Sequence, residues 1–260
     1  MKNNILRSIK KLRICLADLI LPRRCIVCNE KLELDEEHLC IHCSSDMPLT
    51  RFWQLKHNRM ADKFNEAIQK QLEERWAVDG VTSGVHERYA YAAALFFFND
   101  DADYKRIPYA IKYEGNLSAG KHFGTLLGHG LATAGWLSDI DIIIPVPLHW
   151  FRRWRRGYNQ AEVIAMGISS ELDRPVRTDI LKRHKYTKTQ IRLNINEKAS
   201  NVAGSFSVIP CSHEGIRHIL LVDDVFTTGS TLLACFTALR KAFPPNVRIS
   251  VATLGFVGRA

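Results

Sequence analysis

Residues 219–231 of this chain read ILLVDDVFTTGST, and this stretch decides the fold. Its four leading aliphatic residues are typical of a strand that is buried on both faces of a sheet. Two carboxylates, Asp223 and Asp224, stand at the end of that strand, and a hydroxyl-rich turn around Gly229 opens a helix. A buried strand that runs directly into a helix predicts an α/β protein with a mostly parallel sheet and a ligand site at its carboxyl edge.

The turn around Gly229 predicts a cradle for a single phosphate group. Glycine lets the backbone approach a ligand without a Cβ in the way, and N–H groups at a helix start face an anion with the helix dipole behind them. The predicted phosphate-binding residues are Thr227, Thr228, Gly229, Ser230 and Thr231. Asp223 and Asp224 would repel the phosphate, so we expect them to bind ribose hydroxyls and Mg2+ beside it. A capped helix alone would explain one threonine or the glycine, but not the whole string.

Outward from this stretch, strand patterns alternate with helical patterns. We expect further strands at 92–98, 140–147, 205–209 and 247–254, and helices at 104–113, 117–134, 160–172 and 230–243. Strands that alternate with helices need crossover connections, which again favours a parallel sheet flanked by helices. The polar segment 51–88, with a helix-like middle at about 60–77, is interpreted as a connecting region and not as core, and residues 89–260 as the main domain.

Residues 145–160 form a second candidate ligand segment, which reads PVPLHWFRRWRRGYNQ. It follows a predicted strand, so a parallel sheet would place it at the same edge as the phosphate turn. Guanidinium groups match pyrophosphate oxygens well, and a glycine permits close backbone approach. The predicted pyrophosphate loop comprises Arg152, Arg156, Gly157 and Asn159. A solvated basic loop with aromatic residues packed beneath it fits the same residues equally well.

Four cysteines near the N-terminus have the spacing of a zinc site. Cys25 and Cys28 form one pair, and Cys40 and Cys43 form another after eleven intervening residues. Zn2+ takes four thiolates in a closed tetrahedral shell, which leaves no position for water and predicts a structural role. The predicted zinc module covers 25–50. His38 and His42 lie close enough to replace one of the cysteine ligands, but we favour the interpretation that both are exposed histidines beside a zinc ribbon. Four cysteines could also hold an iron–sulfur centre, which stays an alternative to zinc.

Composition and charge narrow the class of protein. The 260 residues include 46% hydrophobic ones, and no stretch approaches the roughly 18 apolar residues of a membrane span. Residues 1–24 predict an amphipathic basic helix without a signal-peptide cleavage site, which packs on its own domain or, as the minor alternative, on a membrane surface. The thiols favour a reducing, cytoplasmic setting. The net charge of +9 favours polyanionic ligands without choosing between DNA and a phosphorylated small molecule.

The stretch 219–231 resembles the signature of type I phosphoribosyltransferases, which bind phosphoribosyl pyrophosphate. The resemblance implies that Asp223 and Asp224 are the catalytic pair, that Mg2+ accompanies the ligand, and that residues 182–198 stand where these enzymes carry a mobile hood. From the residues alone, 182–198 are equally consistent with a plain flexible loop.

The whole pattern is similar to the ComF family, known from natural competence, and to its GntX-like relatives. It combines the cysteine module, the loop at 145–160 and the phosphate turn, together with Lys112 to Gly115 and the segment from Gln190 to Phe206. Lys198 stands where the family usually has arginine. The resemblance implies a role in DNA uptake or nucleotide metabolism, with single-stranded DNA and competence proteins such as a DNA-uptake helicase as partners. A non-catalytic phosphoribosyl pyrophosphate sensor and a DNA-binding competence factor remain alternatives to an enzyme.

Overall fold

The computed structural model describes residues 18, 21–79, 87–98, 103–137, 139–184, 204–210 and 214–258. The predicted N-terminal helix over 1–24 and the predicted hood over 182–198 fall largely outside these described residues. Within them, no helix combines the length and the apolar character needed to cross a bilayer.

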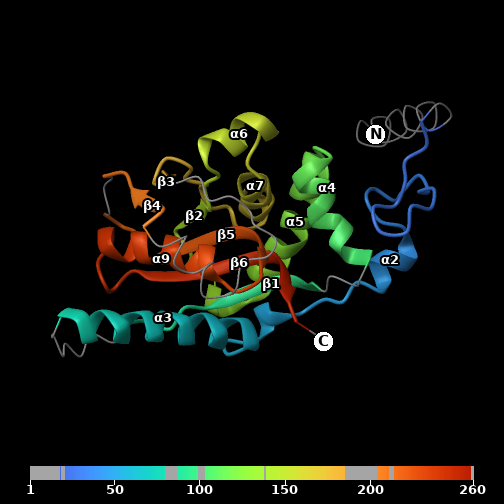
Figure 1. Ribbon diagram of the computed structural model, residues 1–260. Coiled ribbons are helices and arrows are strands. Elements are labelled where there is room, and N and C mark those ends of the chain that lie inside the picture. Colours follow the sequence, from blue (N-terminus) through green and yellow to red (C-terminus); the bar gives the residue numbers. More distant parts are fainter. Residues whose placement is uncertain are drawn as a thin grey trace.

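A four-stranded parallel sheet forms the centre of the molecule, which confirms the predicted fold class (Figure 1). Its order is β1 (Ala92–Phe98), β6 (Arg248–Val257), β5 (His218–Phe226) and β2 (Ile142–Pro145). The central strands stay in register along most of their length, with Val222 opposite both Ala252 and Pro145. All four strands therefore end at one edge, where the two candidate ligand segments begin.

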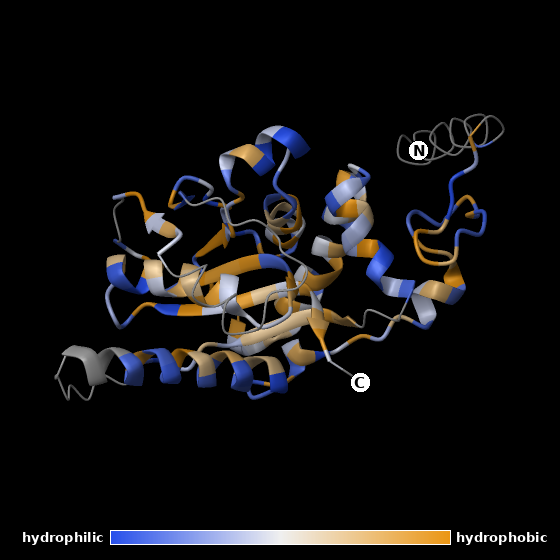
Figure 2. Cartoon of the chain, viewed as in Figure 1, coloured by the Kyte–Doolittle hydropathy of each residue, from blue (hydrophilic) through white to orange (hydrophobic). Residues whose placement is uncertain are grey.

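Helices cover both faces of the sheet, because side chains of a strand alternate between its two sides. Ile219 and Leu221 belong to one buried cluster, and Leu220 and Val222 to the other. The first face is covered by α3 (Arg59–Asp79) and α9 (Ser230–Ala242), and the second by α4 (Arg106–Tyr113), α5 (Leu117–Thr133) and α7 (Gln160–Leu172). Figure 2 shows the apolar strands enclosed between these layers.

Helix α3 corrects the interpretation of 51–88 as a connection without core residues. Met60, Ala61, Phe64 and Ile68 are buried members of the same cluster as Ile219 and Leu221. The spacing of these four residues places them on one side of a helix, and charged and polar residues fill most of the other positions. The helix therefore packs as a layer against the sheet, while the predicted domain boundaries stay predictions.

Replacing Phe64 with alanine should lower the free energy of unfolding by about 3 to 5 kcal/mol, because the ring is fully buried. It makes edge contacts with Phe226 and Phe236, at centroid distances of 6.3 and 5.8 Å. Urea unfolding measures the change. The exposed Glu66 on the same helix provides the control, and Glu66→Ala should change stability by less than about 0.5 kcal/mol. A loss below about 1 kcal/mol for Phe64→Ala would contradict a core role for α3.

Two further elements differ from the sequence-based expectation. The segment 145–160 contains a helix, α6 (Trp150–Arg156), where only a loop was expected. The predicted strand at 205–209 is present as β4 (Phe206–Val208), but it pairs antiparallel with β3 (Leu181–Arg183) and not with the main sheet. The other elements of the described residues are α2 (Ile41–Ser45) and short 3-10 helices at Phe52–Gln54, Asp103–Lys105 and Gly135–Leu137.

A buried polar network ties the strands together at the opposite, amino edge of the sheet. His218 lies 2.7 Å from Asp139 Oδ1 through Nδ1 and 2.8 Å from Ser250 Oγ through Nε2. The arrangement has the order of a catalytic triad, but Ser250 is fully buried and no reactant can reach its hydroxyl. We therefore assign it a structural role, since Ser250 Oγ also accepts a hydrogen bond from the Tyr91 backbone.

Candidate functional site

Asp223 and Asp224 lie inside β5 and not just after it. The strand continues to Phe226 because it keeps its partner β6, with Val225 opposite Gly255 and Phe226 opposite Phe256. The Asp224 side chain is buried, with the residue only 6% exposed, while Asp223 is half-buried. Both carboxylates still belong to the carboxyl edge, because the other strands end within the same few positions.

Lys112 from α4 pairs with Asp224 at this edge. Its Nζ lies 2.9 Å from Asp224 Oδ1. Burial alone would lower the pKa of Lys112, but the Asp224 carboxylate outweighs burial and the pKa is raised. The second oxygen of the same carboxylate, Oδ2, is buried without a hydrogen-bond partner among the described residues. A buried charged oxygen without a partner is costly, so this atom marks a position for a cation or a hydroxyl.

Asp223 has an unusually weak acid group. Burial, followed by the negative charge of Asp224, raises its pKa to about 7. Its Oδ1 accepts a hydrogen bond from the Asp224 backbone N–H at 2.9 Å. A bound cation would shift this carboxyl toward its charged form, since an opposite charge favours ionisation. Perturbed carboxyls of this kind cluster at functional sites.

Two features of the glycine turn require a glycine at position 229. Gly229 has φ +77°, in the left-handed region, and an added Cβ would lie 2.7 Å from the Phe226 ring. Gly229 is the N-cap residue of α9 and offers no capping side chain of its own, while Thr228 Oγ1 accepts a hydrogen bond from Ser230 N at 3.4 Å. Among the predicted phosphate-binding residues, Thr228 and Ser230 bond each other through their hydroxyls. Lys63 of α3 donates to the Thr227 carbonyl at 3.2 Å, which adds a positive charge beside the turn.

A cavity of about 460 Å³ opens next to this turn. Its walls come from α4 and from the carboxyl ends of β1 and β5, and the lining residues are Phe98, Lys105, Arg106, Pro108, Tyr109, Lys112, Tyr113, Val225 and Thr227. Three cationic side chains and three aromatic rings in one cavity favour an anionic ligand with an apolar or planar portion. Its volume falls in the range of small-molecule sites.

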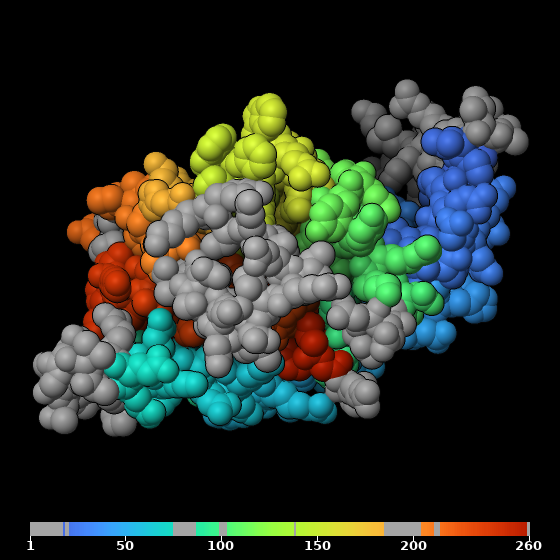
Figure 3. Space-filling view, in the orientation of Figure 1, coloured from blue at the N-terminus to red at the C-terminus, as the bar shows by residue number. Residues whose placement is uncertain are grey.

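Helix α6 divides the arginines of the second segment into two groups. Arg152 and Arg156 are one helical turn apart and half-buried, while Arg153 and Arg155 are exposed. The Arg156 guanidinium lies 5.4 Å from the centroid of the Tyr113 ring, beside the cavity. In the space-filling view, α6 stands out at the surface next to α4 (Figure 3). Arg152 and Arg156 thus share the less exposed face of the helix, and their contact with pyrophosphate stays a prediction.

Arg183 of β3 joins this group, although the sequence analysis did not single it out. Burial and the nearby Arg152 lower the pKa of Arg183, while Cys235 and Asp223 act in the opposite direction. Its guanidinium also lies 5.1 Å from the centroid of the Phe206 ring. Arg183 therefore interacts electrostatically with both the second segment, through Arg152, and the acidic pair, through Asp223.

The structure gives Gly157 and Asn159 structural roles in the second segment. Gly157 has φ +82° and ends α6, and an added Cβ would meet no atom of the described residues within 4 Å. A glycine is therefore favoured here by the left-handed backbone at the end of α6, and not by a close contact with another part of the chain. The Asn159 amide donates to the Val146 carbonyl at 3.0 Å and accepts from Ala161 N at 3.2 Å. Both of its polar groups hold the segment in place, and a contact with pyrophosphate stays a prediction.

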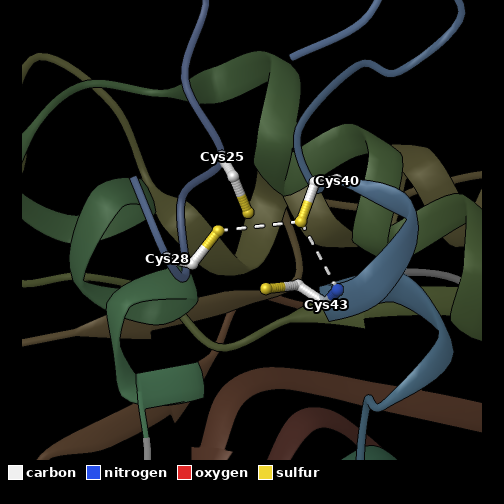
Figure 4. Close-up of side chains that lie close together, drawn as sticks. All are labelled: Cys25, Cys28, Cys40 and Cys43. Carbon is white, nitrogen blue, oxygen red and sulfur yellow. Dashed lines mark hydrogen bonds between the residues drawn. The ribbon is translucent and has the colours of Figure 1, made fainter. Parts of the chain in front are cut away.

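The four cysteines form a separate cluster, as predicted. Their thiols point toward one another and lie within 4.8 Å of each other (Figure 4). Cys28 Sγ and Cys40 Sγ are 3.6 Å apart, close to the ~3.8 Å expected between sulfurs in a tetrahedral zinc site. The donor set therefore fits a structural zinc ion. Burial opposes ionisation of Cys25, but backbone N–H groups from Cys28 and Cys40 bring its pKa down to about 7.

The cysteine module packs directly against the main fold. Its buried residues, including Leu32, Leu39 and Met47, belong to the same cluster as the inner face of α5. Backbone carbonyls of Cys43 and Val27 accept hydrogen bonds from Tyr104 and Arg106 at 2.8 and 3.2 Å. The module therefore shares its apolar core with the helices of the second face.

His38 corrects the expectation of two exposed histidines in the module. His42 is exposed, but His38 is only 9% exposed and lies against α5. Its Nε2 is 3.3 Å from Ser118 Oγ, and its ring makes an edge contact with His122 at a centroid distance of 5.1 Å. Burial lowers the pKa of both imidazoles.

These features define the class of protein: an α/β fold whose parallel sheet carries an acidic pair and a glycine-centred turn at its carboxyl edge, with a four-cysteine module beside it. No family model matches the chain. It is 46% identical over 110 residues to competence protein F of Haemophilus influenzae, covering 42% of this chain and 48% of that protein. It is 36% identical over 105 residues to the DNA utilization protein YhgH of Escherichia coli O157:H7, covering 40% and 44%.

Competence protein ComFC of Bacillus subtilis is 33% identical over 94 residues, which cover 35% of each protein. The chain is therefore related to the ComF proteins, and the resemblance found in the sequence is confirmed. The matched parts span about half or less of the length of these relatives, from 35% to 48%.

Proposed function

We propose that this protein binds phosphoribosyl pyrophosphate with Mg2+ at the carboxyl edge of the sheet. The acidic pair is the observation that carries the proposal: Asp224 Oδ2 is buried and has no hydrogen-bond partner in the part of the chain that the structure describes, and Asp223 has a pKa of about 7. Both carboxyls lie on the strand that runs into the glycine turn. A ribose hydroxyl or a cation would supply a partner for Asp224 Oδ2, and a cation would favour the charged form of Asp223.

Each part of the ligand has a matching group. The turn at Thr227 to Thr231 and the first N–H groups of α9 would take the 5-phosphate. Arg152 and Arg156 of α6 would face the pyrophosphate, together with Arg183, which interacts electrostatically with both Arg152 and Asp223. Mg2+, when bound, would be held by one or both carboxylates together with phosphate oxygens, which is its usual arrangement in phosphate sites.

Isothermal titration calorimetry of the full chain with phosphoribosyl pyrophosphate and Mg2+ tests the proposal. A few charge-assisted hydrogen bonds are enough for a dissociation constant near the micromolar range, so we expect a 1:1 heat that weakens when Mg2+ is removed. Ribose 5-phosphate and pyrophosphate alone should each bind more weakly. No heat at millimolar ligand would refute the proposal.

The relatives named for competence and DNA utilization support a role in DNA uptake or use for this chain. Helix α6 favours direct contact with single-stranded DNA as a second function. Trp150 and Trp154 are 69% and 78% exposed, and Arg153 and Arg155 lie exposed on the same helix. Exposed aromatic rings among cations are the elements with which proteins bind single strands, because bases stack on the rings while cations contact phosphates.

Changing both Trp150 and Trp154 to alanine should weaken binding of an oligothymidine by about 1 to 3 kcal/mol for each stacked base. Fluorescence anisotropy at several salt concentrations measures the effect. Met166→Ala, which removes an exposed apolar side chain on α7, is the control and should leave affinity unchanged. Equal affinity of the double variant and the wild type, or an absence of salt dependence, would exclude this function.

Turnover is a separate question from binding. In an enzyme, a nucleophile would form a bond to the anomeric carbon of the ribose while the bond from that carbon to pyrophosphate breaks. Release of pyrophosphate in the presence of one nucleobase among several would identify a phosphoribosyltransferase and its acceptor. Binding without release for any acceptor would identify a sensor.

A further inference from the structure

A second group of metal-binding side chains lies where the cysteine module meets α5. One ligand atom each from Glu37, His38 and His122 lies within 4.8 Å of the other two. Glu37 and His38 belong to the module, between its two cysteine pairs, and His122 belongs to α5. The group is distinct from the four thiols, which form their own cluster.

We propose that Glu37, His38 and His122 bind a divalent transition metal, with Zn2+ as the best-suited ion, and that this metal joins the cysteine module to the main fold. Two imidazoles and one carboxylate are a common zinc ligand set, and they leave a coordination position for water. Thiolate-free nitrogen and oxygen donors suit zinc and its first-row neighbours better than Mg2+ or Ca2+.

The three ligand atoms need to move only a short distance toward one another to reach the spacing of a zinc site. Zinc ligands lie about 3.4 Å apart in a tetrahedral site with bonds of about 2.0 to 2.1 Å. His122 Nδ1 and Glu37 Oε2 are already 3.8 Å apart. The Glu37 side chain is exposed and can rotate freely to approach the imidazoles, whereas His38 is buried and fixed. Ser118 Oγ, at 3.3 Å from His38 Nε2, limits rotation of that ring.

Comparison with a second pair on the same helix separates a metal site from a simple ion pair. His129 of α5 faces Glu171 at 3.6 Å, a distance similar to that of the His122 pair. His129 is largely exposed, and within the described residues no further histidine, cysteine or acidic group joins it in a cluster of three. The third ligand, His38, is therefore what distinguishes the site at Glu37.

The metal content of the full chain tests this proposal. Protein loaded with excess Zn2+ and then desalted should hold two zinc ions per chain, of which a mercurial reagent releases only the thiolate-bound one. Zinc beyond the first equivalent should also raise the melting temperature by about 5 to 10 °C, because the ion binds the folded state alone. One zinc ion per chain would refute the proposal.

Two variants and a control assign the second ion. His122→Gln should hold one zinc ion, and His129→Gln should still hold two. Glu37→Gln changes an exposed side chain, so it keeps the fold, and it should weaken binding of the second ion by more than the roughly 10-fold that loss of an outer-shell partner costs. Cobalt-to-thiolate absorption should be the same in all four proteins, which shows that the cysteine site is intact. Two tightly bound ions in both His122→Gln and Glu37→Gln would overturn the assignment.

Discussion

Asp223→Asn should weaken binding of Mg2+ and phosphoribosyl pyrophosphate by about 10- to 150-fold at pH 8, without lowering the stability of the fold. The loss corresponds to one charge-assisted contact of about 1.5 to 3 kcal/mol. Stability should hold because burial and Asp224 raise the pKa of Asp223 to about 7. Linkage makes such an acid cost stability progressively as pH rises from its unfolded pKa of about 4 to its folded pKa of about 7, and this cost is complete at pH 8, so a neutral asparagine avoids it.

The pH profile provides a sharper form of the same experiment. Wild-type affinity for the Mg2+ complex should increase from pH 6 to pH 8, as Asp223 ionises and can accept the cation. Part of the increase comes from the ligand, because a phosphate monoester also titrates near pH 6. In the Asp223→Asn variant only the titration of the ligand phosphate remains, so its affinity should change less with pH. Titration calorimetry at several pH values measures both curves.

The controls follow from the neighbouring groups. Asp179→Asn alters an exposed carboxylate that pairs with Arg177 at 2.8 Å, and it should leave affinity unchanged. Asp224 is a poorer choice for the first test, because its loss leaves Lys112 without its counter-charge, at a cost of about 3 kcal/mol. Unchanged affinity and an unchanged pH profile in Asp223→Asn would show that the acidic pair does not contact the ligand.

The sheet and its outer helices could be predicted because their signals are local. Runs of aliphatic residues define β1 and β5, and α7 begins and ends at the residues that its pattern indicated. Helix α3 carried a usable signal as well, in the helical spacing of Met60, Phe64 and Ile68. The dense charges between them suggested a solvated connection, because the sequence alone does not show that a sheet face lacks a covering layer.

Helix α6 and the partners of the acidic pair depend on contacts between distant parts of the chain. The side chain that caps α6 is His149, which is not among the usual capping residues, so its start had no recognisable signal. Lys112 precedes Asp224 by more than a hundred residues, and Arg183 lies on a strand of three residues. Only the packing of α4 and β3 around the carboxyl edge brings these cations to the site.

Removal of zinc from the cysteine cluster should have the largest effect on the structure. Binding by four thiolates contributes about 10 to 16 kcal/mol in small zinc modules, and residues 21–50 contain only one helix, of five residues. Cys40→Ser should therefore abolish the cobalt-to-thiolate absorption and expose the amides of this segment to rapid hydrogen exchange. The amides of β5 and β6 should stay protected, because their ladder does not involve the module.

Because the module and α5 share an apolar core, we expect Cys40→Ser to increase hydrogen exchange in both, with the larger increase in the module. Leu39 and Met47 pack in the same cluster as α5, so Cys40→Ser should also speed exchange in α5, although less than in the module. His42→Gln changes an exposed side chain in the same turn and should alter neither absorption nor exchange. If Cys40→Ser kept the amides of 21–50 protected, the apolar contacts with α5 would suffice to fold the module, and the closeness of the four thiols would be a consequence of that packing and not its cause.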